Sequence, residues 1–181
     1  MSVDIVRPLR RDPFPVTLAG RASLVPYRDA RWWLETLAVY VPRRVIIPAL
    51  TEDARERVTD GLLEGTVTGR DLEAVSLGLL GHVTGTGKRW WTGYNLALIS
   101  GSDSAVGAMT VRGVDPERCT LAQWCSAVQT LYLDGASEEA RMKFMAATEP
   151  PPDGYDVGAA WDDGMSLVEA QRVARSLPGS N

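Results

Sequence analysis

Apolar residues between Thr120 and Asp134 recur with the 3.6-residue period of an α-helix, in the clearest such pattern of the chain. A second amphipathic segment at 88–100 follows the glycine-rich run 81–87. Each helix must bury its apolar face against another element. The stretch Gly81–Asp134 therefore predicts two helices that face each other across a glycine-rich connection. The apolar face of the second helix consists of Leu121, Trp124, Cys125, Val128, Leu131 and Tyr132.

Other segments carry helical periodicity or capping signals, with prolines and glycines between them. Val45–Leu50 differs, because it is a short β-branched run broken by Pro48, which favours a connector or an edge strand. The pattern predicts a mostly α-helical protein, a compact bundle of about five to seven helices. The further helical segments are 29–41, 51–63, 70–82, 102–111, 137–147 and 165–176.

The N-terminal 27 residues combine four prolines with the closely spaced Arg7, Arg10 and Arg11. Proline fixes its own φ and favours extended geometry in the residue before it. Residues 1–27 are therefore expected to form an extended N-terminal arm, in which Val16–Leu18 or Ser23–Val25 can pair as a short strand. Such an arm either packs on its own domain or docks on another subunit.

The remaining chain divides by composition. The helical domain is expected at 28–148, because the periodic segments end before three consecutive prolines at 150–152. Residues 149–164 then form an acidic linker rich in proline and glycine. Ser166–Glu169 fits a capping box, so residues 165–181 are expected to hold a C-terminal helix and tail.

Charge and hydropathy restrict the partners. The net charge is −4, so general affinity for nucleic acids is not expected, and the arginines of the arm favour protein contact. No apolar segment of a signal peptide follows Met1–Arg11, and no run approaches the ~20 apolar residues that cross a bilayer. The sequence predicts a protein used in the cytosol or in a particle assembled there, with neither membrane nor nucleic acid as partner.

The segment Gly81–Arg89 matches a phosphate-binding loop only in part. That motif places glycine five residues before Gly-Lys and Ser or Thr directly after the lysine. With Gly87 and Lys88 in these places, the first position is His82 and the last is Arg89. The run is therefore interpreted as a turn between helices, and a nucleotide site at Gly81–Lys88 is kept as an alternative.

No constellation of residues indicates a catalytic centre. His82 is the single histidine, and no Ser, Cys or acid stands at a recognisable motif spacing from it. Glu138–Glu139 and Asp162–Asp163 are typical of a first helical turn and of a solvated linker. Cys119 and Cys125 are expected to be buried free thiols. We therefore expect no catalytic residue, no cofactor and no metal.

The paired tryptophans have two readings. Neighbouring residues on a helix point about 100° apart, so Trp32–Trp33 and Trp90–Trp91 cannot each bury both rings against one flat face. One ring of each pair lies at an interface, where Trp is enriched, or both belong to a wide face inside one domain. Core positions are expected for Trp91, Tyr94, Trp124 and Tyr132. Partner contacts are expected for Arg7, Arg10, Arg11, Phe14, Trp32, Trp90 and Trp161.

Two phrases, RWWTGYNLALIS and GAMTVRGVDPERCTLAQWCSAVQTLYL, together with the acidic C-terminal segment, resemble small proteins from the tail-gene modules of actinobacterial siphophages. The resemblance covers about residues 30–150 and includes two groups, helical minor tail or tail-tip proteins and tail assembly chaperones. The first implies a non-enzymatic virion protein, assembled in the host cytoplasm, that binds other tail proteins or copies of itself. The second implies a protein that shields the tape-measure chain and is absent from the virion.

Overall fold

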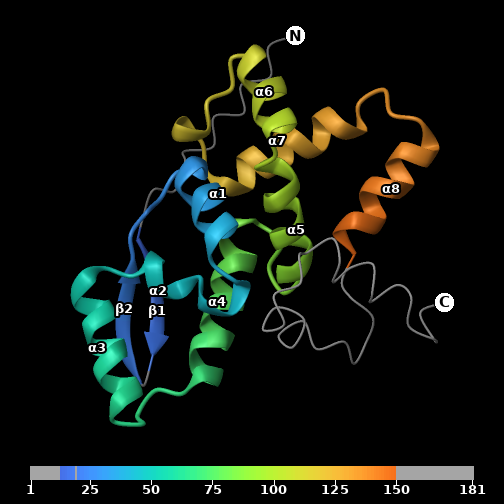
Figure 1. Ribbon diagram of the computed structural model, residues 1–181. Coiled ribbons are helices and arrows are strands. Elements are labelled where there is room, and N and C mark those ends of the chain that lie inside the picture. The colour runs from blue at the N-terminus through green and yellow to red at the C-terminus, as the bar shows by residue number, and fades with distance from the viewer. Residues whose placement is uncertain (1–12, 19, 150–181) are drawn as a thin grey trace, which may run out of the picture.

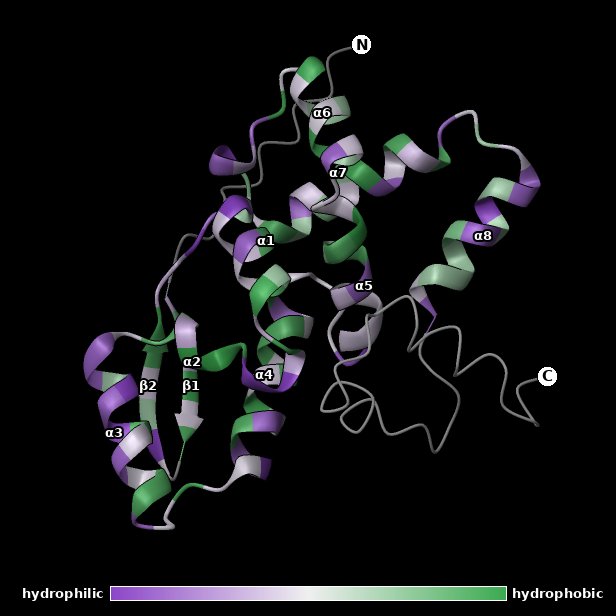
Figure 2. Ribbon diagram, viewed as in Figure 1, coloured by the Kyte–Doolittle hydropathy of each residue, from purple (hydrophilic) through white to green (hydrophobic). Residues whose placement is uncertain are grey.

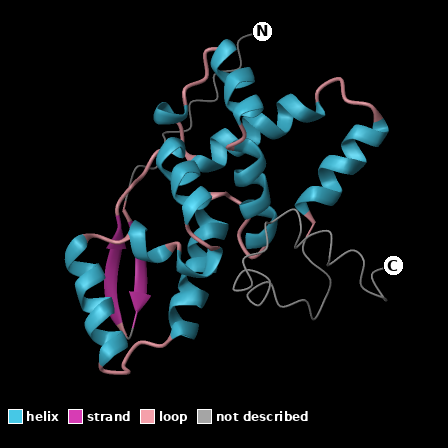
Figure 3. Ribbon diagram, in the orientation of Figure 1, coloured by secondary structure: helices cyan, strands magenta, loops and turns pink. Residues whose placement is uncertain are grey.

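Helices make up most of the structure, a computed structural model that describes residues 13–18 and 20–149 of the chain. This part contains eight α-helices and one two-stranded sheet, as Figure 3 shows. The mostly α-helical class is confirmed, and the small sheet adds to it. The elements are β1 (Phe14–Leu18), β2 (Arg21–Val25), α1 (Ala30–Val39), α2 (Ile46–Ala49), α3 (Glu52–Leu63), α4 (Gly69–Val83), α5 (Trp90–Ser100), α6 (Asp103–Val111), α7 (Leu121–Leu133) and α8 (Glu138–Thr148), with short 3-10 turns η1 (Pro42–Arg44) and η2 (Pro116–Arg118).

Seven of these helices correspond to expected segments, and α2 is the addition that raises the number above the expected five to seven. The connector or edge strand expected at Val45–Leu50 is therefore wrong. Ile46, Ala49 and Leu50 are buried there, and the Ile46 N–H donates a hydrogen bond to Ser76 Oγ of α4 at 3.3 Å. Pro48 is tolerated because N–H groups in a first helical turn have no partner within the helix.

Residues 14–25 of the expected arm form an antiparallel hairpin, and its two strands include both segments that the sequence offered as a short strand, Val16–Leu18 and Ser23–Val25. Val16 pairs with Ser23, and the turn between Leu18 and Arg21 contains Gly20 at φ +72°, a conformation that favours glycine. Val16, Leu18 and Val25 point into the core, so this part of the arm belongs to the folded domain. Residues 1–12, the linker at 149–164 apart from Glu149, and the C-terminal helix at 165–181 lie outside the described residues.

The hairpin lies between α3 and α4, and α1, α5 and α7 pack at the other end of the molecule (Figure 1). In Figure 2 the hydrophobic residues, drawn in green, are concentrated in α2 and in the second half of α5. The main core cluster joins the hairpin to α1–α5, and a second cluster joins α1 and α6 to α7. Within the described chain α5 is the most enclosed long helix. The buried residues of α5 are Trp91, Gly93, Tyr94, Asn95, Leu96, Ala97 and Ser100.

Candidate functional site

The glycine-rich connection between α4 and α5 is packed tightly. A Cβ atom on Gly81 would stand far inside contact distance of the Gly87 carbonyl oxygen, and one on Gly93 would overlap Thr84 Oγ1. The Gly87 N–H donates to the Gly81 carbonyl at 2.8 Å, and the Arg89 N–H donates to the Thr86 carbonyl at 3.2 Å. These two N–H groups are therefore used inside the connection. Because helix α4, not a strand, precedes them, the geometry favours a packing role over the alternative of a phosphate-binding loop.

Gly81→Ala should destabilise the protein by about 2–3 kcal/mol, because the added methyl group meets backbone that cannot rotate away. Gly78→Ala is the matched control one turn earlier in α4, where an added Cβ meets nothing within 4 Å. That control should gain about 0.5–1 kcal/mol from the higher helix propensity of alanine. Urea unfolding measures both, and equal effects of the two substitutions would contradict the close approach.

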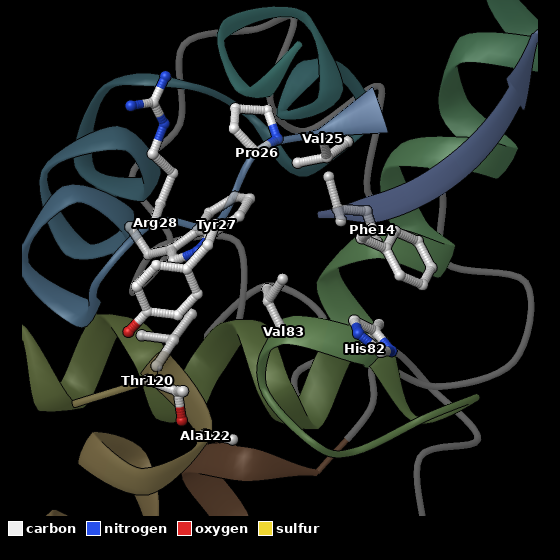
Figure 4. A pocket seen from close by; sticks show the side chains of 12 residues that line it. Phe14, Val25, Pro26, Tyr27, Arg28, His82, Val83, Thr120 and Ala122 are labelled. Carbon is white, nitrogen blue, oxygen red and sulfur yellow. The ribbon is translucent and has the colours of Figure 1, made fainter. Parts of the chain in front are cut away.

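A pocket of 160 Å³ opens where the hairpin, α4 and α7 meet (Figure 4). In this view Phe14 and His82 lie on one side, Tyr27 and Thr120 lie on the other, and Val83 stands between them. The volume is below the ~300–1,000 Å³ of typical ligand pockets, so it admits a side chain or another small group. Its lining consists of Phe14, Val25, Pro26, Tyr27, Arg28, Trp33, Leu79, His82, Val83, Thr120, Leu121 and Ala122.

His82 stacks on Phe14, with ring centroids 4.1 Å apart and an angle of 24° between the planes. Burial of part of the imidazole lowers the pKa of His82 below its ordinary value of 6.5, so the ring is mostly neutral at pH 7. A neutral ring flat against an aromatic side chain is a packing partner. Phe14 is thereby held at the point where the described chain begins.

The lowered pKa of His82 makes stability depend on pH. Because the unfolded chain binds the proton more readily, this contribution is fully present above about pH 6.5 and is lost as pH falls through the folded-state pKa. We expect the free energy of unfolding to decrease between pH 7.5 and 5, and to decrease less in His82→Gln. Hydrogen bonds from the Thr68 hydroxyl and N–H lower the pKa of Asp71 below its ordinary value of 3.8. Protonation of Asp71 therefore affects the free energy of unfolding below the range from pH 7.5 to 5. An identical decrease in both proteins would contradict burial of the ring as the cause.

Arg28 forms another wall of the pocket. Its guanidinium carbon lies 5.0 Å from the centre of the Trp32 ring, a cation–π contact. Its Nε is buried without a hydrogen-bond partner. Figure 4 shows this guanidinium on the side of the pocket away from His82. Arg28 therefore links the pocket to the first tryptophan pair instead of supplying a charge beside the imidazole.

The thiols lie outside this pocket and are poor nucleophiles. Burial raises the pKa of Cys119 to about 11, with Asp115 and Asp29 adding to the effect. Burial raises the pKa of Cys125 to about 12. Both thiols therefore stay protonated at neutral pH. They are free, as expected, although Cys119 is only half-buried and Cys125 is buried.

Within residues 13–18 and 20–149, no group of three or more His, Cys, Asp or Glu side chains is placed to hold a metal ion. The helices of this same part are too short or too polar to span a bilayer. The pocket is lined mainly by aromatic and aliphatic side chains, and the Thr120 hydroxyl in its wall is already bonded to Gln123 at the start of α7.

Of the three described residues that were expected to contact partners, one lies in this pocket. Phe14 lines it, whereas Trp32 and Trp90 are half-buried and pack against the main core. Each stands edge-on to its neighbour, at 87° and 85° respectively, and the neighbours Trp33 and Trp91 are buried. This arrangement fits the reading of a wide face inside one domain. Arg7, Arg10, Arg11 and Trp161 lie outside the described residues.

Tyr132 is the core residue that the sequence placed wrongly. Trp91, Tyr94 and Trp124 are buried as expected, but Tyr132 is 39% exposed. Its ring stacks on Phe144 of α8, at 5.7 Å between centroids, beyond the edge of the core. Sequence reasoning also missed Tyr27, Arg28 and Thr120 as pocket residues, because no periodicity or motif marks them.

Comparison with protein-family models, with curated proteins and with solved structures finds no match.

Proposed function

We propose that the protein is a non-enzymatic phage structural protein, a minor tail component that binds other tail proteins and stays in the virion. The observation that carries the proposal is the surface of α8. This helix contributes no buried residue, and Met142 and Met145 are 62% and 56% exposed. Residues three apart share one helix face, so the two methionines expose apolar side chains on the same side of α8. Exposed apolar patches of this kind mark sites of protein contact.

The chemistry of the described residues supports binding as the role. Both cysteines are protonated thiols, and the imidazole of His82 is stacked on Phe14. The amide groups of the glycine-rich connection are bonded within it. None of these groups is arranged as a nucleophile with a base, the pairing that most covalent catalysis uses.

Tail assembly chaperone is the second candidate, and the two methionines of α8 favour it. Methionine side chains are flexible and polarisable, and they adapt to apolar partners of varied shape. A chaperone of the tape-measure protein would cover many different apolar segments during assembly. It would then leave before the particle is complete.

Mass spectrometry of purified virions separates these candidates. Presence of the protein in the virion supports the minor tail component. Absence from the virion, together with binding to the tape-measure protein, supports the chaperone. Absence from virions with no binding to any tail protein would overturn both.

The role of the α8 surface is tested with the double variant Met142→Glu and Met145→Glu. It should weaken binding to the tail partner by about tenfold or more, since central apolar side chains carry most of the energy of an interface. Leu63→Glu is the matched control, because Leu63 is 82% exposed but lies at the end of α3. Equal binding by the double variant and the control would exclude α8 as the contact surface.

A further inference from the structure

The outer edge of β2 has backbone groups without partners. In an antiparallel pair of strands, opposed residues alternate between pairs that exchange hydrogen bonds and pairs whose N–H and C=O groups face away from each other. Pro15 has no N–H to donate and lies opposite Leu24, so this pair is of the second kind. The pair two residues along, Thr17 and Ala22, is of the second kind as well. Ala22 and Leu24 are exposed, and no other described element pairs with their backbone.

A pocket of 350 Å³, which we call the edge pocket, opens between β2 and α3. Figure 1 shows α3 along the β2 side of the hairpin and α4 along the β1 side. The buried side chains of Leu18 and Val58 give the edge pocket an apolar floor, and its volume lies within the ~300–1,000 Å³ of sites that hold ligands. Ser23 also lines it and is 7% exposed, and its hydroxyl bonds to no described residue. Since buried polar groups normally have partners, this hydroxyl indicates a group that is bound there.

The edge pocket also has an uncompensated negative charge. Asp60 and Glu64 line it, and residues four apart share one helix face. They lie at the C-terminal end of α3, where the helix dipole is negative and the last turn contains no basic residue. Arg21 and Arg57 are further lining residues, but within the described chain neither forms an ion pair. A basic side chain between the two carboxylates would offset their repulsion.

We propose that the edge of β2 binds an extended segment of another protein as a third strand, with a basic side chain in the edge pocket. Exposed sheet edges bind peptides in this way: backbone hydrogen bonds supply affinity, and pockets for alternate side chains supply specificity. Ala22 and Leu24 provide two donors and two acceptors for the added strand. Every second side chain of that strand points toward α3. On this side a basic residue pairs with Asp60 and Glu64, and a polar one bonds to the Ser23 hydroxyl.

This inference does not depend on the proposed function, and either can fail without the other. It concerns the edge of the hairpin, whereas the tail proteins are expected on α8. A second copy of this chain, paired through its own β2, is the competing occupant of the edge.

Selection of short random peptides on the full chain tests the proposal. The selected peptides should contain Lys or Arg and carry β-branched residues, which favour extended strands. N-methylation of a selected peptide should weaken binding by about tenfold or more at alternate residues, where the N–H faces β2, and leave it unchanged at the residues between them. A library without binding peptides, peptides without basic residues, or binding that tolerates N-methylation at every position would each overturn the proposal.

Ala22→Pro removes one outward-facing donor of β2 and should weaken peptide binding by about tenfold or more. Thr17→Pro is the matched control, because it removes an outward-facing donor from β1 on the opposite edge. Circular dichroism verifies that both variants are folded, and the methylated peptides keep the test valid if one is not. Equal binding by the two variants overturns the proposal.

The charge of the edge pocket is tested by Asp60→Lys combined with Glu64→Lys, which should change the selected peptides from basic to acidic. Asp53→Lys combined with Glu56→Lys is the control, on exposed positions of α3 outside the edge pocket, and should leave the selection basic. Identical selections by the two double variants overturn the proposal. Sedimentation of the unaltered chain should show a monomer. A dimer that Ala22→Pro dissociates also overturns the proposal, and assigns the edge to a second copy.

Discussion

Deleting residues 1–27 should unfold the protein. The deletion removes Val16, Leu18 and Val25, which are buried in the main core beside α4. Burial of each aliphatic side chain contributes about 1.5–3 kcal/mol, so the three together contribute about 5–9 kcal/mol. A loss of this size is comparable to the whole free energy of unfolding of a typical domain, about 5–15 kcal/mol. Far-ultraviolet circular dichroism and thermal unfolding measure the result.

Deleting only residues 1–12 is the matched control. This shorter deletion keeps every core side chain of the hairpin, and the Phe14–His82 stack remains. The protein should therefore keep a cooperative unfolding transition. If removal of residues 1–27 left the transition temperature unchanged, the hairpin would contribute nothing to stability. That result would contradict its packing against α4 in the main core.

Trp124→Ala should destabilise the protein by about 3–5 kcal/mol, the cost of removing a large aromatic side chain from a core. Trp124 is 0% exposed and is the largest member of the second core cluster, with Ala30, Met109 and Val128 around it. Its indole N–H also donates a hydrogen bond to the Ser100 carbonyl at 3.0 Å, which joins α7 to the end of α5. The midpoint of urea unfolding reports the change, with an unchanged slope as evidence of two-state behaviour.

Trp124→Phe separates the two contributions of this side chain. Phenylalanine keeps an aromatic ring but cannot donate to Ser100, so the expected cost is about 1–3 kcal/mol. Trp90→Ala serves as a second control. Because Trp90 is only half-buried, this substitution should lower the free energy of unfolding by less than Trp124→Ala does. Loss of partner binding at unchanged stability in Trp124→Ala would place the ring on an interface, against the burial described above.

The α-helices were predictable where their signals are local. The helix at α7 has the expected apolar face at period 3.6, and the structure adds a capping box at its start. The Gln123 N–H donates to Thr120 Oγ1 at 3.2 Å, and the Thr120 N–H donates to Gln123 Oε1 at 3.0 Å. Tyr132 continues the same period but lies beyond the neighbouring helices. Periodicity shows which side of a helix is apolar, and it does not show how far the core extends along that side.

The elements that sequence reasoning missed depend on contacts between distant residues. Pro13 and Pro15 favoured an extended arm with one short strand, yet two strands pair here, and Pro15 is exposed on the edge strand β1, a position that proline tolerates. The turn of α2 depends on burial beside Ser76, thirty residues away. The pocket also depends on contacts between distant residues, since its lining includes four separate parts of the chain, represented by Phe14, Arg28, His82 and Thr120. Only Phe14 had been selected from the sequence.

The attachment of α8 has a consequence for the cooperativity of the molecule. This helix buries no side chain fully; the Tyr132–Phe144 stack and the hydrogen bond from the Trp91 indole N–H to the Glu149 carbonyl, at 2.8 Å, join it to α7 and α5. Such a segment can open at a lower free energy than the core, which includes buried Trp91 itself. Local opening of α8 would expose the Tyr132 ring and release the Trp91 indole N–H while the rest of the domain stayed folded.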